Sequence, residues 1–327
     1  MKANIEAVNA LFLQDDFANR TLKITGEKVF RVQVGNLRHY RRGSNGRIYK
    51  SLTTFISQVM PRNKFLENWR SNLAAELGSS DKADEYVEAT ADYGSGLHIC
   101  TADFCRNKGV NWSEFEYWAF DYLTAAGFKN GTLNAAFSEL TKDFASMLQF
   151  LHDYQVEIIA VEIPVFLKEG IATLIDLVVE MNEKDYTDKT PPEKRKRIKA
   201  IINIKSGKKG FYTEHLMQLE GERRMFNQTF GKSVGYEIDN VFNLAPSDWK
   251  TEPTYKIVNQ TKAINQGKID KLFTLKLKEA DLYGILGEPD KSYPVFTGAT
   301  AYGDSPAKAI RLMNYKDFTK MKIEQQK

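Results

Sequence analysis

The sequence predicts an α/β protein in which helices flank a mixed β-sheet. Apolar residues up to about position 153 mostly recur at helical spacing, whereas strand-like apolar segments begin near residue 155. Three of these segments follow one another directly, and a fourth comes only after a helix. This order indicates a sheet with antiparallel and parallel neighbours that is covered by helices.

The N-terminal part is expected to begin with a hairpin and to continue as helices. Residues 22–34 include an alternating apolar stretch, with Gly26 and Glu27 near a turn, which predicts the hairpin. The basic stretch 36–50 predicts a loop. The expected helices cover residues 51–60, 63–77, 82–108, 112–126 and 132–153.

The C-terminal part is expected to carry the sheet. Pro164 lies in the first strand and predicts an edge strand or a bulge, because proline cannot donate to a strand ladder. A charged loop over 182–197 separates the second strand from the third. The expected strands cover 156–166, 172–181, 199–206, 236–246 and 254–260, with helices over 212–230 and 263–286.

Composition excludes several classes of protein. No apolar run reaches the roughly 20 residues that a membrane span needs. The N-terminus lacks the long apolar segment of a signal peptide. Two cysteines, Cys100 and Cys105, are too few for a disulfide framework and are expected to be buried core residues. We therefore expect no membrane association and a cytoplasmic location, which for a viral protein is the host cytoplasm.

Positive charge is concentrated in two stretches, although the net charge is only +4. Residues 36–50 contain five Lys and Arg and no acid, and residues 189–209 contain a denser set. A charge run is more often a solvated face than a binding surface. The second run ends inside a candidate catalytic motif, which favours contact with an acidic partner such as nucleic acid.

Two strands carry polar residues that apolar strands rarely tolerate. Asp176 lies in an apolar strand, and an acid there needs a partner or a metal ion unless it faces solvent. Lys205 ends the next strand, two residues after Asn203, so the two side chains share a face. Lys205 could form a salt bridge with the acid, or it could orient a water molecule or stabilise a phosphate.

The first strand offers further carboxylates, Glu162 and Glu157. Two carboxylates from neighbouring strands, together with carbonyl and water oxygens, are the ligands that Mg²⁺ and Mn²⁺ prefer. The spacing of five residues puts Glu157 and Glu162 on opposite faces of the strand.

These residues occur in an order that resembles a known family. Gly94 and His98 form a helical Gly-x-x-x-His pattern, and Glu162, Asp176, the Asn203-x-Lys205 pair and Gln218 follow. The order resembles the PD-(D/E)xK nuclease superfamily, in the RecB-like branch that includes phage exonucleases and exonucleases similar to the mitochondrial genome maintenance exonuclease. Residues 47–69 also resemble the segment that precedes the histidine in those exonucleases. The resemblance covers roughly residues 40–230.

The resemblance implies a restriction-endonuclease-like core with a helical N-terminal cap. It divides the chain into a hairpin and cap (1–93), a nuclease core (94–250) and a C-terminal extension of uncertain role (251–327). It implies a Mg²⁺- or Mn²⁺-dependent nuclease that hydrolyses DNA and acts as an exonuclease on single strands or duplex ends.

The resemblance also assigns roles to individual residues. Asp176, Glu162, Asn203 and His98 are implied as metal ligands, and Lys205, Asp176, Glu162 and Gln218 as catalytic residues. The residues expected to contact DNA are Lys208, Lys209, Arg195, Arg197, Tyr212, Arg41 and Arg42.

Two positions depart from the family pattern. The family has Asp or Glu where this chain has Asn203, and an amide oxygen brings no charge to a cation. Related sequences often carry Tyr where this chain has Glu222. Another acid could compensate, with Glu157, Glu214 and Glu220 as candidates. The alternatives are a catalytically impaired nucleic-acid-binding protein and a virion or assembly protein on a nuclease fold.

Overall fold

The computed structural model describes most of the chain between residues 29 and 300. The described residues are 29–34, 37–42, 47–60, 64–107, 109–185, 187, 189–207, 210–231, 236–266, 268–279, 291–296 and 299–300.

A mixed ten-stranded β-sheet organises the described residues. The strands are β1 (Val29–Val34), β2 (Leu37–Arg42), β3 (Ile48–Ser51), β4 (Glu157–Phe166), β5 (Ile171–Asn182), β6 (Arg197–Ile204), β7 (Asn240–Pro246), β8 (Tyr255–Asn259), β9 (Lys291–Phe296) and β10 (Ala299–Thr300). Their order is β10-β9-β1-β2-β3-β5-β6-β7-β8, and β4 pairs with the other side of β5. The β3–β5 and β6–β7 pairs are parallel and the others are antiparallel, which confirms the predicted mixed sheet.

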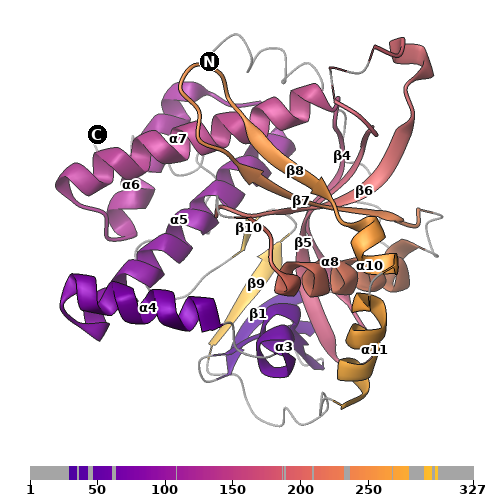
Figure 1. The fold of residues 1–327 in the computed structure, drawn as a ribbon, viewed down its shortest axis with the longest axis horizontal. Coiled ribbons are helices and arrows are strands. Elements are labelled where there is room, and N and C mark those ends of the chain that lie inside the picture. The colour runs from indigo at the N-terminus through magenta and orange to yellow at the C-terminus, as the bar shows by residue number, and fades with distance from the viewer. Residues whose placement is uncertain are drawn as a thin grey trace.

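Helices cover both faces of this sheet (Figure 1). They are α3 (Leu52–Val59), α4 (Lys64–Leu77), α5 (Ser80–Asn107), α6 (Trp112–Ala125), α7 (Asn130–Asp153), α8 (Thr213–Phe226), α10 (Thr261–Gln266) and α11 (Ile269–Glu279). One apolar core lies between the sheet and α5, α6 and α7. A second lies between the sheet and α3, α8, α10 and α11.

Side-chain alternation in β6 shows how one strand serves both cores. Ile202 and Ile204 pack toward α5–α7, whereas Ile201 packs toward α8. Asn203 and Lys205 follow Ile201 at two-residue spacing, so both lie on the face that α8 covers. The two candidate site residues of this strand are therefore directed at α8.

The predicted loop over residues 36–50 is wrong. Most of it forms β2 and the start of β3, and β2 pairs with β1 in register from Val29 opposite Arg42 to Val34 opposite Leu37. The many arginines made this segment resemble a solvated loop, but it is a strand in which His39 and Tyr40 are buried. The expected turn at Gly26 and Glu27 lies outside the described residues.

The helices predicted between residues 51 and 230 and the strands predicted from residue 156 onward are confirmed with shifted ends. Strand β4 pairs only with β5 among the described strands, so Pro164 lies in an edge strand as expected. Helix α8 ends at Phe226 and continues as a π-helical turn, Asn227–Gly231. The helix predicted over 263–286 divides into α10 and α11, and residues 280–290 lie outside the described part.

Two expectations from composition can be compared with the structure. Cys100 and Cys105 are both free and buried, as predicted. Among the described residues, no helix combines the length and apolar character that crossing a bilayer requires.

Candidate metal centre and the adjoining lysine

Three side chains from three elements converge at one point beside the sheet. His98 comes from α5, Glu162 from β4 and Asp176 from β5, and one potential ligand atom of each lies within 4.8 Å of the others. His98 Nδ1 is 3.3 Å from Asp176 Oδ1 and 4.0 Å from Glu162 Oε1. Two carboxylates and an imidazole form a donor set suited to a divalent cation. The structure thus brings together three of the four predicted metal ligands.

Strand register places the two carboxylates opposite each other. Val161 is paired with Leu177, and Ile163 with Ile175, so Glu162 lies across from Asp176. Glu162 has φ +49°, in the left-handed region that residues other than glycine rarely adopt. Such a conformation costs about 1–3 kcal/mol, and residues that hold it often lie at functional sites.

Neighbouring charges keep Asp176 ionised despite its burial. Burial alone would raise the pKa of this carboxyl group, but His98 and Lys205 outweigh it and lower the pKa. The Ile204 backbone N–H also donates to Asp176 Oδ2 at 2.7 Å. For His98, burial alone would lower the pKa, but Asp176 and Glu162 raise it. The imidazolium and the carboxylates therefore stabilise one another.

A glycine lets α5 come close to the end of β6. A Cβ atom on Gly94 would lie 2.7 Å from the Oγ atom of Ser206. Ser206 is the residue that directly follows Lys205. Gly94 is one helical turn before His98, so this close approach carries His98 toward the strand end. The predicted Gly-x-x-x-His pattern has a packing reason in this fold.

A chain of hydrogen bonds joins Lys205 to α8 and back to β6. Lys205 Nζ donates to Gln218 Oε1 at 2.8 Å, and Gln218 Nε2 donates to Glu222 Oε1 at 2.8 Å. Asn203 Nδ2 donates to the same Glu222 oxygen at 2.8 Å. Asn203 thus directs its amide nitrogen at Glu222, and its oxygen is buried without a partner among the described residues.

Burial shifts the pKa values of both charged groups in this chain. Burial, and then the charge of Asp176, raise the pKa of Glu222 to about 8. Burial lowers the pKa of Lys205, and the carboxylates of Asp176 and Glu222 offset part of that shift. Lys205 is therefore a less hydrated and more easily deprotonated amine than a surface lysine.

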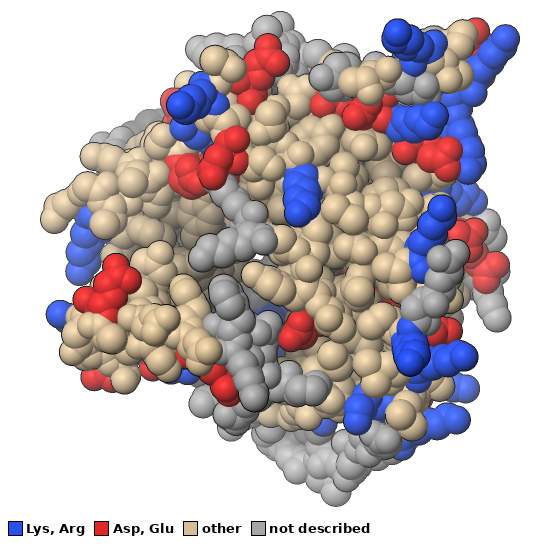
Figure 2. Space-filling model, viewed as in Figure 1, with Lys and Arg blue, Asp and Glu red and all other residues tan. Residues whose placement is uncertain are grey.

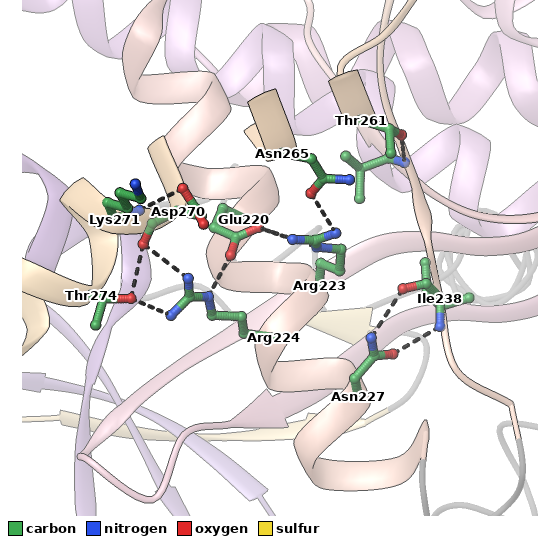
Figure 3. Close-up of polar contacts among 11 residues, drawn as sticks. Glu220, Arg223, Arg224, Asn227, Ile238, Thr261, Asn265, Asp270, Lys271 and Thr274 are labelled. Atoms are coloured by element: carbon green, nitrogen blue, oxygen red, sulfur yellow. Dashed lines mark hydrogen bonds and ion pairs between the residues drawn. The ribbon is translucent and has the colours of Figure 1, made fainter. Parts of the chain in front are cut away.

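Glu222 is a site residue that the sequence analysis missed. None of the three acids proposed to compensate for Asn203 has this position. Glu220 is buried against Arg223 and Arg224, on another side of α8 (Figure 3). Glu157 pairs with Arg197 at 3.5 Å, and Glu214 lies in the first turn of α8. The available signal was helical spacing, because Glu222 follows Gln218 by four residues and shares its face.

The structure does not bring all predicted DNA contacts to this site. Arg197 begins β6 and donates to backbone oxygens of Gln155 and Glu180, and Arg195 donates to Thr190 O. Both lie at the end of β6 away from Lys205. They belong to the β5–β6 hairpin, which projects at the upper right of Figure 1, where Figure 2 shows a group of Lys and Arg side chains.

The structure places three of the other predicted contacts, Tyr212, Arg41 and Arg42, in two separate regions. Tyr212 precedes α8, and its ring lies 5.4 Å from that of His215. Burial, and then the charge of Lys205, lower the pKa of His215 to about 4, so this end of α8 borders the site. Arg41 and Arg42 end β2, with Arg42 lying 5.1 Å over the ring of Phe166. Lys208 and Lys209 lie outside the described residues.

No family model matches the sequence, and no curated protein matches it either.

Proposed function

We propose that this chain is a metal-dependent nuclease that hydrolyses phosphodiester bonds of DNA, of the RecB-like PD-(D/E)xK type. The observation that carries the proposal is the convergence of His98, Glu162 and Asp176 beside a buried lysine, Lys205. A strand-borne carboxylate pair and a lysine on the next strand form a set suited to phosphoryl chemistry. The proposal includes a restriction-endonuclease-like core over residues 94–250 and a helical cap within residues 1–93.

The donor set fits a hard divalent cation. Glu162, Asp176 and His98 would hold Mg²⁺ or Mn²⁺, and the two carboxylates would balance its charge. When bound, such an ion supplies Lewis-acid chemistry to a phosphate oxygen and makes a bound water more acidic. The left-handed backbone of Glu162 supports this assignment, because folding alone does not favour glutamate there.

Lys205 would bind the scissile phosphate or orient the attacking water. Its amine is held by Gln218, and it lies close enough to Asp176 and Glu222 for each to shift its pKa. Glu222 supplies the carboxyl group that Asn203 lacks, and it is hydrogen-bonded to Asn203 itself. We therefore assign to Glu222 the task of orienting Asn203, Gln218 and, through Gln218, Lys205.

An activity assay on two lysine variants tests the proposal. Lys205→Ala should abolish Mg²⁺-dependent cleavage of end-labelled single- and double-stranded DNA and leave the fold intact. Lys199→Ala is the matched control, because Lys199 lies on the same face of β6 but contacts the ring of Tyr236 instead. Undiminished cleavage by Lys205→Ala contradicts the proposal. Cleavage from an end, as opposed to an internal site, would identify an exonuclease.

The neutral Asn203 motivates a second candidate, a nucleic-acid-binding or assembly protein on the same fold. Its amide is committed to Glu222 and brings no charge to the metal centre. DNA binding that persists in EDTA, with no cleavage in Mg²⁺ or Mn²⁺, would favour a binding protein. Stoichiometric association with another protein and no affinity for DNA would favour an assembly role.

A further inference from the structure

Asn243 is a buried amide that the proposed reaction does not use. It lies in the middle of β7 and is 0 % exposed. Neither its Nδ2 nor its Oδ1 has a hydrogen-bond partner among the described residues. Buried amide atoms are nearly always satisfied by protein or by ordered water, so this residue requires an explanation.

The neighbours of Asn243 have unpaired polar atoms as well. Asn243 is in register with Asn203 across the parallel β6–β7 pair, so the two amides are adjacent on one face. Val241 precedes Asn243 on that face and packs into the core beneath α8. Asn203 Oδ1 and Glu222 Oε2 are buried without partners among the described residues, like the two atoms of Asn243. Three adjoining side chains thus contribute four unpaired polar atoms under α8.

We propose that Asn203, Asn243 and Glu222 bind one ordered water molecule beneath α8. A water can donate to Asn203 Oδ1, accept from Asn243 Nδ2 and share a third hydrogen bond with Glu222 Oε2, which makes the three hydrogen bonds typical of a buried water. The set includes a donor as well as acceptors, which suits water better than a cation, since a cation would repel the amide N–H. Asn243 is therefore the residue that holds the inner side of this water site.

The water extends the hydrogen-bond chain that ends at Lys205. Along this chain, Asn203 and Gln218 both donate to Glu222, and Lys205 donates to Gln218. Asn243 anchors the buried end of the chain through the water. Its role as a positioning residue for Lys205 rests on the proposed nuclease function, whereas the water site itself does not.

Two variants of the same shape test the water site by folding stability. Asn243→Thr and Asn243→Val differ by a hydroxyl in place of a methyl group, and both suit a strand. With a polar site present, Asn243→Thr should unfold at a higher urea concentration than Asn243→Val. A buried hydroxyl without a partner would give the opposite order.

Val241 provides the matched control on the same strand and face. Val241→Thr places the same hydroxyl against apolar neighbours, so it should unfold at a lower urea concentration than the parent chain. If Asn243→Val is at least as stable as Asn243→Thr, the water site is overturned. The water site is also overturned if the relative stability of Asn243→Thr and Asn243→Val in urea depends on Mg²⁺, because that would indicate a cation site.

Kinetics test the positioning role separately. Asn243→Val should lower kcat roughly 10-fold to 100-fold with KM nearly unchanged, and Asn243→Thr should recover part of the loss. Unchanged kcat in a cleaving enzyme overturns the positioning role. If the parent chain does not cleave DNA at all, the nuclease proposal fails, but the urea experiment still decides the water site.

Discussion

Single residues of the candidate site were predictable where an unusual residue type interrupted a regular pattern. Asp176 and Lys205 interrupt apolar strands, and His98 follows a glycine by one helical turn. Glu222 was not predictable in this way, because an acid on an otherwise polar helix resembles a solvated residue. Its significance depends on burial at 0 % exposure and on the contact with Asn203, which only the folded chain reveals.

The raised pKa of Glu222 predicts a pH-dependent stability. The folded protein holds a proton on this carboxyl up to about pH 8, whereas the unfolded chain releases it near 4.5. Between these values the folded state binds more protons, so stability falls as pH rises, by up to about 1.4 kcal/mol per pH unit. Below pH 4.5 this contribution is fully present.

Glu222→Gln should remove this part of the pH dependence in the metal-free protein. Urea unfolding at pH 5, 6, 7 and 8 in EDTA measures it, and the difference between parent and variant isolates Glu222 from His98, whose raised pKa acts in the same direction. Parallel pH profiles of the parent and the variant would contradict the shift.

At the scale of elements, α8 serves two surfaces. Gln218 and Glu222 face the site, whereas Glu220, Arg223 and Arg224 connect α8 to the C-terminal helices (Figure 3). Arg223 donates to Asn265 of α10, and Arg224 donates to Asp270 O and Thr274 Oγ1 of α11. Helix positions were predictable from apolar spacing, but this network was not, since its charges look like an ordinary solvated run.

Glu220→Gln should destabilise the protein by about 3–5 kcal/mol. The buried carboxylate of Glu220 is the partner of both Arg223 and Arg224, and the variant removes its charge. Glu183→Gln is the control, since Glu183 pairs with Lys196 on an exposed surface and should cost about 1 kcal/mol or less. Denaturant unfolding of both variants measures the difference. Equal losses would show that the Glu220 network does not stabilise α8 against α10 and α11.

At the scale of the whole molecule, the site and the basic hairpin lie at opposite ends of β6. The strand from Arg197 to Ile204 is roughly 23 Å long at about 3.3 Å per residue. The sequence alone predicted the mixed sheet and most helices, because their apolar periods are long. It did not predict the strand order, in which β9 near the C-terminus pairs with β1, because pairing between distant segments leaves no local pattern.

Arg197→Ala should therefore act on stability and leave DNA affinity unchanged. The side chain donates to Gln155 O at 2.7 Å and to Glu180 O at 2.9 Å, so its loss should cost about 1–3 kcal/mol. Urea unfolding and the Kd for single-stranded DNA at fixed salt measure the two effects. Weaker DNA binding with unchanged stability would instead support the contact between Arg197 and DNA that the sequence analysis expects.

The left-handed backbone at Glu162 is unfavourable for folding, although the side chain at this position is useful for the proposed chemistry. Glycine there would relieve the conformational cost, and it would also remove a carboxylate from the candidate metal centre. The attraction between Glu162 and His98 offsets part of the cost of this backbone. The proposed metal centre would give the adverse backbone a further reason, because it needs the Glu162 carboxylate in this place.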